Sequence, residues 1–214
     1  LEHLLRADGV TPVPYVTHAA AGQWVLDRER LLAALTPRTR AVVLVHPNNP
    51  TGHCWSEEDF AWLGAALPEA VAMLSDEVFV DYCWSGAARS FAGRERVFAL
   101  SGLSKVCALP QMKLGWIVLP DLPAVKAGME FIADTYLSVS APVAARAPEW
   151  LARRRDFQAP VRRRCEENRV WLGERVWPVE AGWCAIVPGE GRIEEEERVL
   201  RMIEKGYWVQ PGFY

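Results

Sequence analysis

Short apolar runs alternate with helical patterns along most of the chain. Four runs have the length of buried strands, at residues 40–45, 70–75, 96–100 and 114–119. Between them, residues 27–35 and 56–67 show helical patterns, and the second begins with Ser56 as an N-cap before an acidic first turn. This alternation predicts an α/β protein with a largely parallel sheet.

The remaining elements have weaker patterns. Further strands are predicted at residues 10–16, 183–187 and 207–209, and further helices at residues 1–7, 124–135, 143–155 with a break at Pro148, 159–176 and 193–205. The runs at 96–100 and 114–119 are predicted to pair without an intervening helix. Because the pattern changes in the last third, we expect a large domain over residues 1–155 and a smaller one over 156–214.

One chemistry-bearing residue follows each of the first three buried runs. Asn49 comes after the run at 40–45, Asp76 after 70–75, and Lys105 after 96–100, with a second cation, Lys113, eight residues further on. Open parallel α/β sheets place their ligand sites just past the carboxyl ends of the strands. The sequence therefore predicts a ligand site that contains these residues.

Three motifs in this order resemble the fold type I, class I/II aminotransferases. They are HPNNPTG at residues 46–52, SDEVFVDY at 75–82, and SGLSK at 101–105 with its continuation LPQMKLGW at 109–116; weaker likeness extends to DTYLS at 134–138 and VQPG at 209–212. The resemblance implies part of a three-layer αβα large domain, followed by the start of a smaller α/β domain. It also implies pyridoxal 5′-phosphate (PLP) as cofactor, transfer of an amino group between an α-amino acid and a 2-oxo acid, and a homodimer.

The resemblance assigns a role to each motif residue. Lys105 matches the lysine that holds the cofactor as a Schiff base and then moves the substrate proton. Asp76 matches the carboxylate that keeps the pyridine nitrogen protonated, whereas Glu77 must face the other way because side chains alternate along a strand. Asn49 matches the donor to the phenolic oxygen, although the same stretch would also form a good turn without a ligand.

The chain departs from the commonest family pattern around the phosphate and the phenolic oxygen. Phe79 stands where many relatives have a tyrosine hydroxyl, so we expect a higher imine pKa. Lys113 replaces a phosphate-binding arginine and loses its bidentate fork, which leaves Ser104 as a further phosphate donor. Gly102 removes the S-x-x-K pattern that would otherwise suggest a serine acyl-enzyme.

Composition limits the other classes of function. A net charge of −3 argues against nucleic-acid binding, because the two arginine runs at 153–155 and 162–164 are closely flanked by acidic residues. No apolar run has the length of a membrane span. Five dispersed cysteines indicate reduced thiols in a cytoplasmic protein. His46 and His53 have no third ligand, so no metal site is expected.

Family members carry their phosphate loop and their carboxylate-binding arginine in segments that would lie before Leu1 and after Tyr214. The chain is therefore expected to be a fragment of such an enzyme.

Two alternatives to an aminotransferase stay open. One is a PLP-dependent lyase or synthase on the same fold, since fold and lysine do not fix the reaction. The other is a truncated relative without activity.

Overall fold

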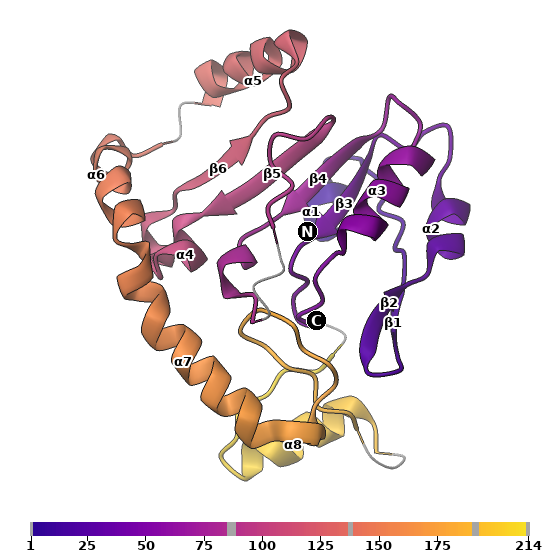
Figure 1. Ribbon diagram of the computed structural model, residues 1–214, viewed down its shortest axis with the longest axis vertical. Coiled ribbons are helices and arrows are strands. Elements are labelled where there is room, and N and C mark those ends of the chain that lie inside the picture. Colours follow the sequence, from indigo (N-terminus) through magenta and orange to yellow (C-terminus); the bar gives the residue numbers. More distant parts are fainter. Residues whose placement is uncertain (1, 85–88, 137–138, 190–192, 213–214) are drawn as a thin grey trace.

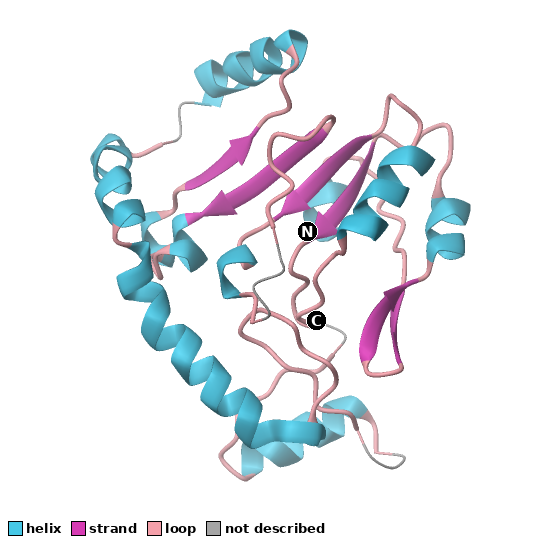
Figure 2. Ribbon diagram, viewed as in Figure 1, coloured by secondary structure: helices cyan, strands magenta, loops and turns pink. Residues whose placement is uncertain are grey.

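The computed structural model describes residues 2–84, 89–136, 139–189 and 193–212. Its elements in chain order are α1 (Glu2–Ala7), β1 (Thr17–Ala20), β2 (Gln23–Leu26), α2 (Arg28–Ala34), β3 (Ala41–Val45), α3 (Glu57–Ala66), β4 (Ala72–Asp76), η1 (Val80–Tyr82), β5 (Val97–Gly102), α4 (Leu103–Val106), η2 (Pro110–Met112), β6 (Gly115–Val118), α5 (Pro123–Tyr136), α6 (Ala141–Ala152), α7 (Arg154–Leu172), η3 (Gly173–Arg175) and α8 (Glu195–Glu204). Figure 1 labels the α-helices and strands, and Figure 2 distinguishes helices, strands and loops. Leu1, Leu137 and Ser138, which belong to predicted segments, lie outside the described residues.

A mixed sheet with the order β3-β4-β5-β6 forms the centre of the described structure. β3, β4 and β5 are parallel, whereas β6 runs antiparallel to β5 with Ser101 opposite Trp116. The last two runs pair as predicted, but a four-residue helix, α4, and the turn η2 lie between them, where no helix was expected. The α/β class with a largely parallel sheet is likewise confirmed.

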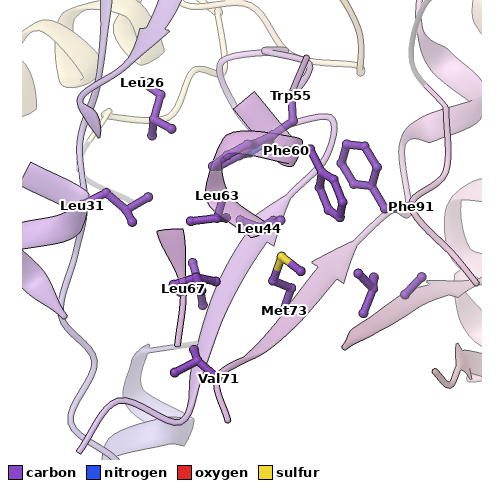
Figure 3. Packing of buried hydrophobic residues seen from close by; sticks show 13 residues of the cluster. Leu26, Leu31, Leu44, Trp55, Phe60, Leu63, Leu67, Val71, Met73 and Phe91 are labelled. Carbon is purple, nitrogen blue, oxygen red and sulfur yellow. The ribbon is translucent and has the colours of Figure 1, made fainter. Parts of the chain in front are cut away.

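The main core lies between α3 and one face of this sheet. Alternate residues of the strands, such as Leu44 and Met73, point toward α3, which contributes Phe60 and Leu63 (Figure 3). Leu63 is fully buried, and burying a side chain of this size stabilises a fold by roughly 1.5–3 kcal/mol. A separate cluster packs α4 against α6 and α7.

The α3 helix begins where the sequence predicts. The Ser56 hydroxyl accepts a hydrogen bond from the backbone N–H of Asp59 at 3.0 Å and donates to its carboxylate at 2.8 Å. This reciprocal cap satisfies one of the N–H groups that a helix start leaves without a partner. It also fixes the end of the loop that leads from β3 to α3.

Three predicted strands are wrong. Residues 10–16 form no strand, because Pro12 and Pro14 lack the N–H donors of a ladder; the strands lie just beyond, in the β1-β2 hairpin. Residues 183–187 and 207–209 are also irregular. In that region Ala181 forms an isolated β-bridge with Cys83, and the Trp177 backbone N–H donates to Ile186 O at 2.8 Å.

The predicted helix break at Pro148 is wrong as well. Pro148 lies inside α6, and Pro160 lies inside α7, while the break falls at Arg153. Ala147, Leu151 and Phe157 pack on the cluster around α4 from both sides of this break. Tertiary packing therefore holds both helices despite the missing backbone donors.

Candidate active site

The three sequence landmarks lie at the carboxyl ends of three neighbouring parallel strands. Val45, the last residue of β3, pairs with Asp76, the last residue of β4, and Asp76 in turn pairs with Leu100 of β5. The backbone N–H of His46 donates to Asp76 O at 2.8 Å, and that of Glu77 donates to Leu100 O at 2.8 Å. The chain therefore leaves all three strands at one edge of the sheet.

Lys105 is held in α4, directly after β5. Leu103 and Val106 of this short helix are buried against α6 and α7, which leaves Ser104 and Lys105 half-buried on its other side. The Lys105 Nζ atom lies 5.4 Å from the ring centroid of Phe79 and 4.7 Å from that of Trp183. Aromatic faces at these distances attract a cation and restrict where the amine can lie.

Tyr82 fixes the backbone of the same helix. Its hydroxyl donates a 2.8 Å hydrogen bond to the carbonyl oxygen of Lys105, and burial raises the pKa of Tyr82 to about 12. The phenol therefore remains a neutral donor at physiological pH. Phe79 and Tyr82 both follow β4. The segment after Asp76 therefore contacts Lys105 in two ways: the Phe79 ring faces the amine, and the Tyr82 hydroxyl binds the backbone carbonyl oxygen of Lys105.

Asp76 and Glu77 have different environments, as strand alternation predicts. Glu77 is buried, and its carboxylate accepts hydrogen bonds from the Ser75 hydroxyl, the Ser90 hydroxyl and the Phe91 backbone N–H. Asp76 is half-buried, and its carboxylate accepts from the backbone N–H of Val78 at 3.2 Å. Glu77 thus serves the fold, while Asp76 keeps lone pairs for another partner.

Asn49 lies in a tight loop between β3 and α3. The Thr51 hydroxyl donates to the Asn48 side-chain oxygen at 2.8 Å, and the Gly52 backbone N–H donates to Asn48 O at 2.8 Å. Gly52 has a φ of +71°, which suits glycine. The motif therefore forms the turn that its composition predicts, with the Asn49 side chain exposed at its tip.

The two histidines of this loop have structural partners. His46 is buried; its Nδ1 accepts from the Trp55 backbone N–H at 3.0 Å, and its Nε2 lies 3.1 Å from Arg89 O. Burial lowers the pKa of His46, which favours the neutral ring that this pattern requires. The His53 Nδ1 atom lies 3.1 Å from Glu180, whose pKa is lowered chiefly by this hydrogen bond.

A segment from the last third of the chain, residues 177–184, connects these loops. The backbone N–H of Glu180 donates to Gly52 O at 3.2 Å, and that of Gly182 donates to Tyr82 O at 3.0 Å. The same segment brings Trp183 onto Lys105. Sequence reasoning did not identify Trp183, because no local motif signals a contact with a residue so far away in the chain.

The structure also locates the two candidate phosphate donors. Ser104 is half-buried in the first turn of α4, next to Lys105. Lys113 is exposed after η2, with a left-handed backbone at φ 51°. Phe79, in contrast, is almost fully buried and offers a ring face to the site.

Comparison with known proteins defines the family. The model of the aminotransferase class I and II family matches residues 1–212, so the chain belongs to this family. Histidinol-phosphate aminotransferase of Ruegeria pomeroyi is 32% identical over 178 residues, which are 81% of this chain and 46% of that protein. Aromatic amino acid aminotransferase of Mycolicibacterium vanbaalenii is 28% identical over 214 residues, 95% of this chain and 59% of that protein.

Solved structures agree with this placement. N-succinyldiaminopimelate aminotransferase from Mycobacterium tuberculosis has a TM-score of 0.73 at 26% identity, covering 94% of this chain and 56% of that one. An aminotransferase from Staphylococcus aureus, at 17% identity, shares the fold with a TM-score of 0.82 over 97% of this chain and 58% of its own. The chain thus spans about half the length of the relatives that it matches. No helix in the described ranges is both long and apolar enough to cross a bilayer.

Proposed function

We propose that this protein is a PLP-dependent aminotransferase that moves an amino group between an α-amino acid and a 2-oxo acid. The observation that carries the proposal is the half-buried Lys105 amine, held between two aromatic rings at the carboxyl edge of a parallel sheet. Membership of the aminotransferase class I and II family supports the same reaction.

The side chains at this edge suit PLP. The cofactor needs an amine for its aldehyde, a carboxylate for its ring nitrogen, donors for its phenolic oxygen, and cations or other donors for its phosphate. Lys105, Asp76 and Asn49 match the first three needs, and Ser104 with Lys113 match the fourth. The carboxylate fits because Asp76, unlike Glu77, is not consumed by buried hydroxyl groups.

Bound PLP would supply an electron-withdrawing ring that takes up the electron pair left when a substrate Cα–H bond breaks. Lys105 Nζ would accept that proton and return it, because its helix and the two rings keep it at one place. The Asp76 carboxylate would hold the proton on the ring nitrogen, and the Asn49 amide would donate to the phenolic oxygen. Lys113 would neutralise phosphate charge without the planar fork of an arginine.

The wider organisation is part of the same proposal. We propose a large cofactor domain over residues 1–155 and a smaller domain over 156–214, with α7 running from one into the other. We also propose a homodimer, supported by α5, which buries no residue and leaves Phe131 and Tyr136 each about three-quarters exposed (73% and 75%). A cytoplasmic location fits the odd number of scattered cysteines.

A product assay tests the reaction. The protein, incubated with PLP, an amino-acid panel and 2-oxoglutarate, is expected to form glutamate together with the 2-oxo acid of the donor. Pyruvate and ammonia without a new amino acid would identify a lyase instead. No turnover at all, in protein that retains PLP, would identify a truncated relative without activity. Either of these last two outcomes would overturn the proposed reaction.

A further inference from the structure

The helix that carries Lys105, α4, is too short to hold its own position. It spans only Leu103–Val106, a single turn, and an isolated helix of this length is not stable in water. Leu103 O accepts from the backbone N–H groups of Cys107 and Leu109, both at 3.1 Å. A helix leaves the carbonyl groups of its last turn without partners of its own. Contacts from other elements must therefore decide where Lys105 lies.

Two of these carbonyl groups are bound by side chains from elsewhere in the fold. The Tyr82 hydroxyl donates to Lys105 O at 2.8 Å, and Gln158 Nε2 donates to Val106 O at 2.9 Å. Tyr82 belongs to the segment after β4, whereas Gln158 lies near the start of α7. The backbone at Lys105 is thus held by donors from two different elements.

Gln158 is an unusual residue for its place. All of α7 is described, and Gln158 is its one buried residue, with 6% of its surface exposed. Val106, whose carbonyl group it binds, belongs to the apolar cluster around α4, where an apolar side chain would be buried at lower cost than an amide. The amide also donates to Asp81 Oδ2 at 2.6 Å. Gln158 therefore joins α4 to the segment after β4.

Arg162 fixes α7 to the same segment, one helical turn further on. Its guanidinium group donates to Asp81 O and, at 3.2 Å, to Cys83 O. Residues four apart lie on one face of a helix, so Gln158 and Arg162 together form a polar contact between α7 and the residues after β4. This contact gives Gln158 a fixed base from which it holds α4.

The position of α4 matters because of the amine that it carries. A group that forms a covalent bond or transfers a proton must lie within reach of its reaction partner, and a misplacement of about 1 Å slows such steps strongly. We propose that Gln158 and Tyr82 are positioning residues, which hold the carbonyl groups of Val106 and Lys105 and thereby place the Lys105 amine for its covalent bond to PLP. This inference rests on the proposed function.

Two related ligands separate this role from general support of the site. PLP forms a covalent bond with a lysine amine, whereas pyridoxamine 5′-phosphate has no aldehyde and binds without one. Gln158→Met keeps the length of the side chain and removes its donors. We expect the rate of adduct formation between PLP and Lys105 to fall about tenfold, the effect of about one hydrogen bond. The affinity for pyridoxamine 5′-phosphate should not change, and Tyr82→Phe should give the same pattern.

Amide hydrogen exchange without any cofactor gives a second readout. Both variants should exchange about tenfold faster across residues 103–109, because α4 loses one of its anchors. Ser56→Ala is the control, since it removes the cap of α3 away from α4. It should lower the stability of the protein but leave both adduct formation and exchange across residues 103–109 unchanged.

Several results would overturn the proposal. Adduct formation at the original rate in both variants would do so, and so would slower adduct formation with unchanged exchange across residues 103–109. A parallel loss of affinity for pyridoxamine 5′-phosphate would show that the two residues support the whole site and not the Lys105 amine. If Gln158→Met does not fold, Tyr82→Phe alone decides between these results.

Failure of the proposed function would look different. The unchanged protein would then form no adduct with PLP at Lys105, and the positioning role would fall with the proposed function. The exchange rates across residues 103–109 need no cofactor, so they would still show whether Gln158 and Tyr82 hold α4.

Discussion

Replacement of Glu77 by alanine is expected to destabilise the protein by about 3 kcal/mol or more, because buried donors would lose their acceptor. Its carboxylate accepts from Ser75 Oγ at 2.9 Å, from Ser90 Oγ at 2.5 Å and from the Phe91 backbone N–H at 2.8 Å. Ser75 and Phe91 are buried, so water cannot replace the acceptor that these two donors lose, whereas Ser90 is exposed. Urea unfolding at neutral pH measures the change.

Asp76→Ala is the matched control, one residue earlier in the same strand end. Asp76 is half-buried and accepts one backbone hydrogen bond at 3.2 Å, so its loss should cost about 1 kcal/mol or less. This comparison would assign the two neighbouring carboxylates different roles: Glu77 supports the fold, and Asp76 remains available to a cofactor. Equal losses of stability in the two variants would contradict this division.

The second large effect is expected from Gly52→Ala. Gly52 has a φ of +71°, and an added Cβ would lie 2.5 Å from both Ala181 O and Val179 Cγ2. The left-handed backbone alone costs an L-residue about 1–2 kcal/mol, and the overlap adds to this by pushing residues 177–184 away from the loop. We expect a marked fall in stability together with weaker retention of PLP, since both Asn49 and Trp183 would shift.

Gly22→Ala separates the two parts of this effect. Gly22 has a similar φ of +79°, but an added Cβ would meet nothing within 4 Å. It therefore reports the backbone cost alone, and the difference between the two variants reports the packing of residues 177–184 on the Asn49 loop. If both variants lost the same stability and both kept PLP, this packing would not support the site.

Elements that carry a strong local signal could be predicted from the sequence. β3 and β4 have continuous apolar runs, and α3 has its Ser56 cap, so local chemistry suffices for each. The strand predicted at residues 183–187 failed because a strand needs a neighbouring strand, whereas Ile186 O accepts its backbone hydrogen bond from Trp177 in an irregular segment. Pro148 failed as a helix break because packing around Ala147 overrides the local backbone preference.

The residues of the candidate site likewise include some that carry a local signal in the sequence and one that does not. Asp76 and Lys105 could be singled out because each follows an apolar run in a motif. Glu77 is buried with its own hydrogen-bond partners and Asp76 is half-buried, while the cofactor role of Asp76 stays a prediction. Trp183 could not be singled out, because its proximity to Lys105 depends on backbone bonds from residues 177–184 to two loops far away in the chain. Long-range contacts of this kind leave no periodic signal in a single sequence.

The most direct test of the central claim is to trap the cofactor on the protein. Purified protein is incubated with PLP, reduced with borohydride, digested and analysed by peptide mapping. We expect one reduced adduct, on Lys105, and its loss in Lys105→Ala but not in Lys113→Ala. An adduct on another lysine, or folded protein without any adduct, would contradict the assignment of Lys105 as the residue that holds the cofactor.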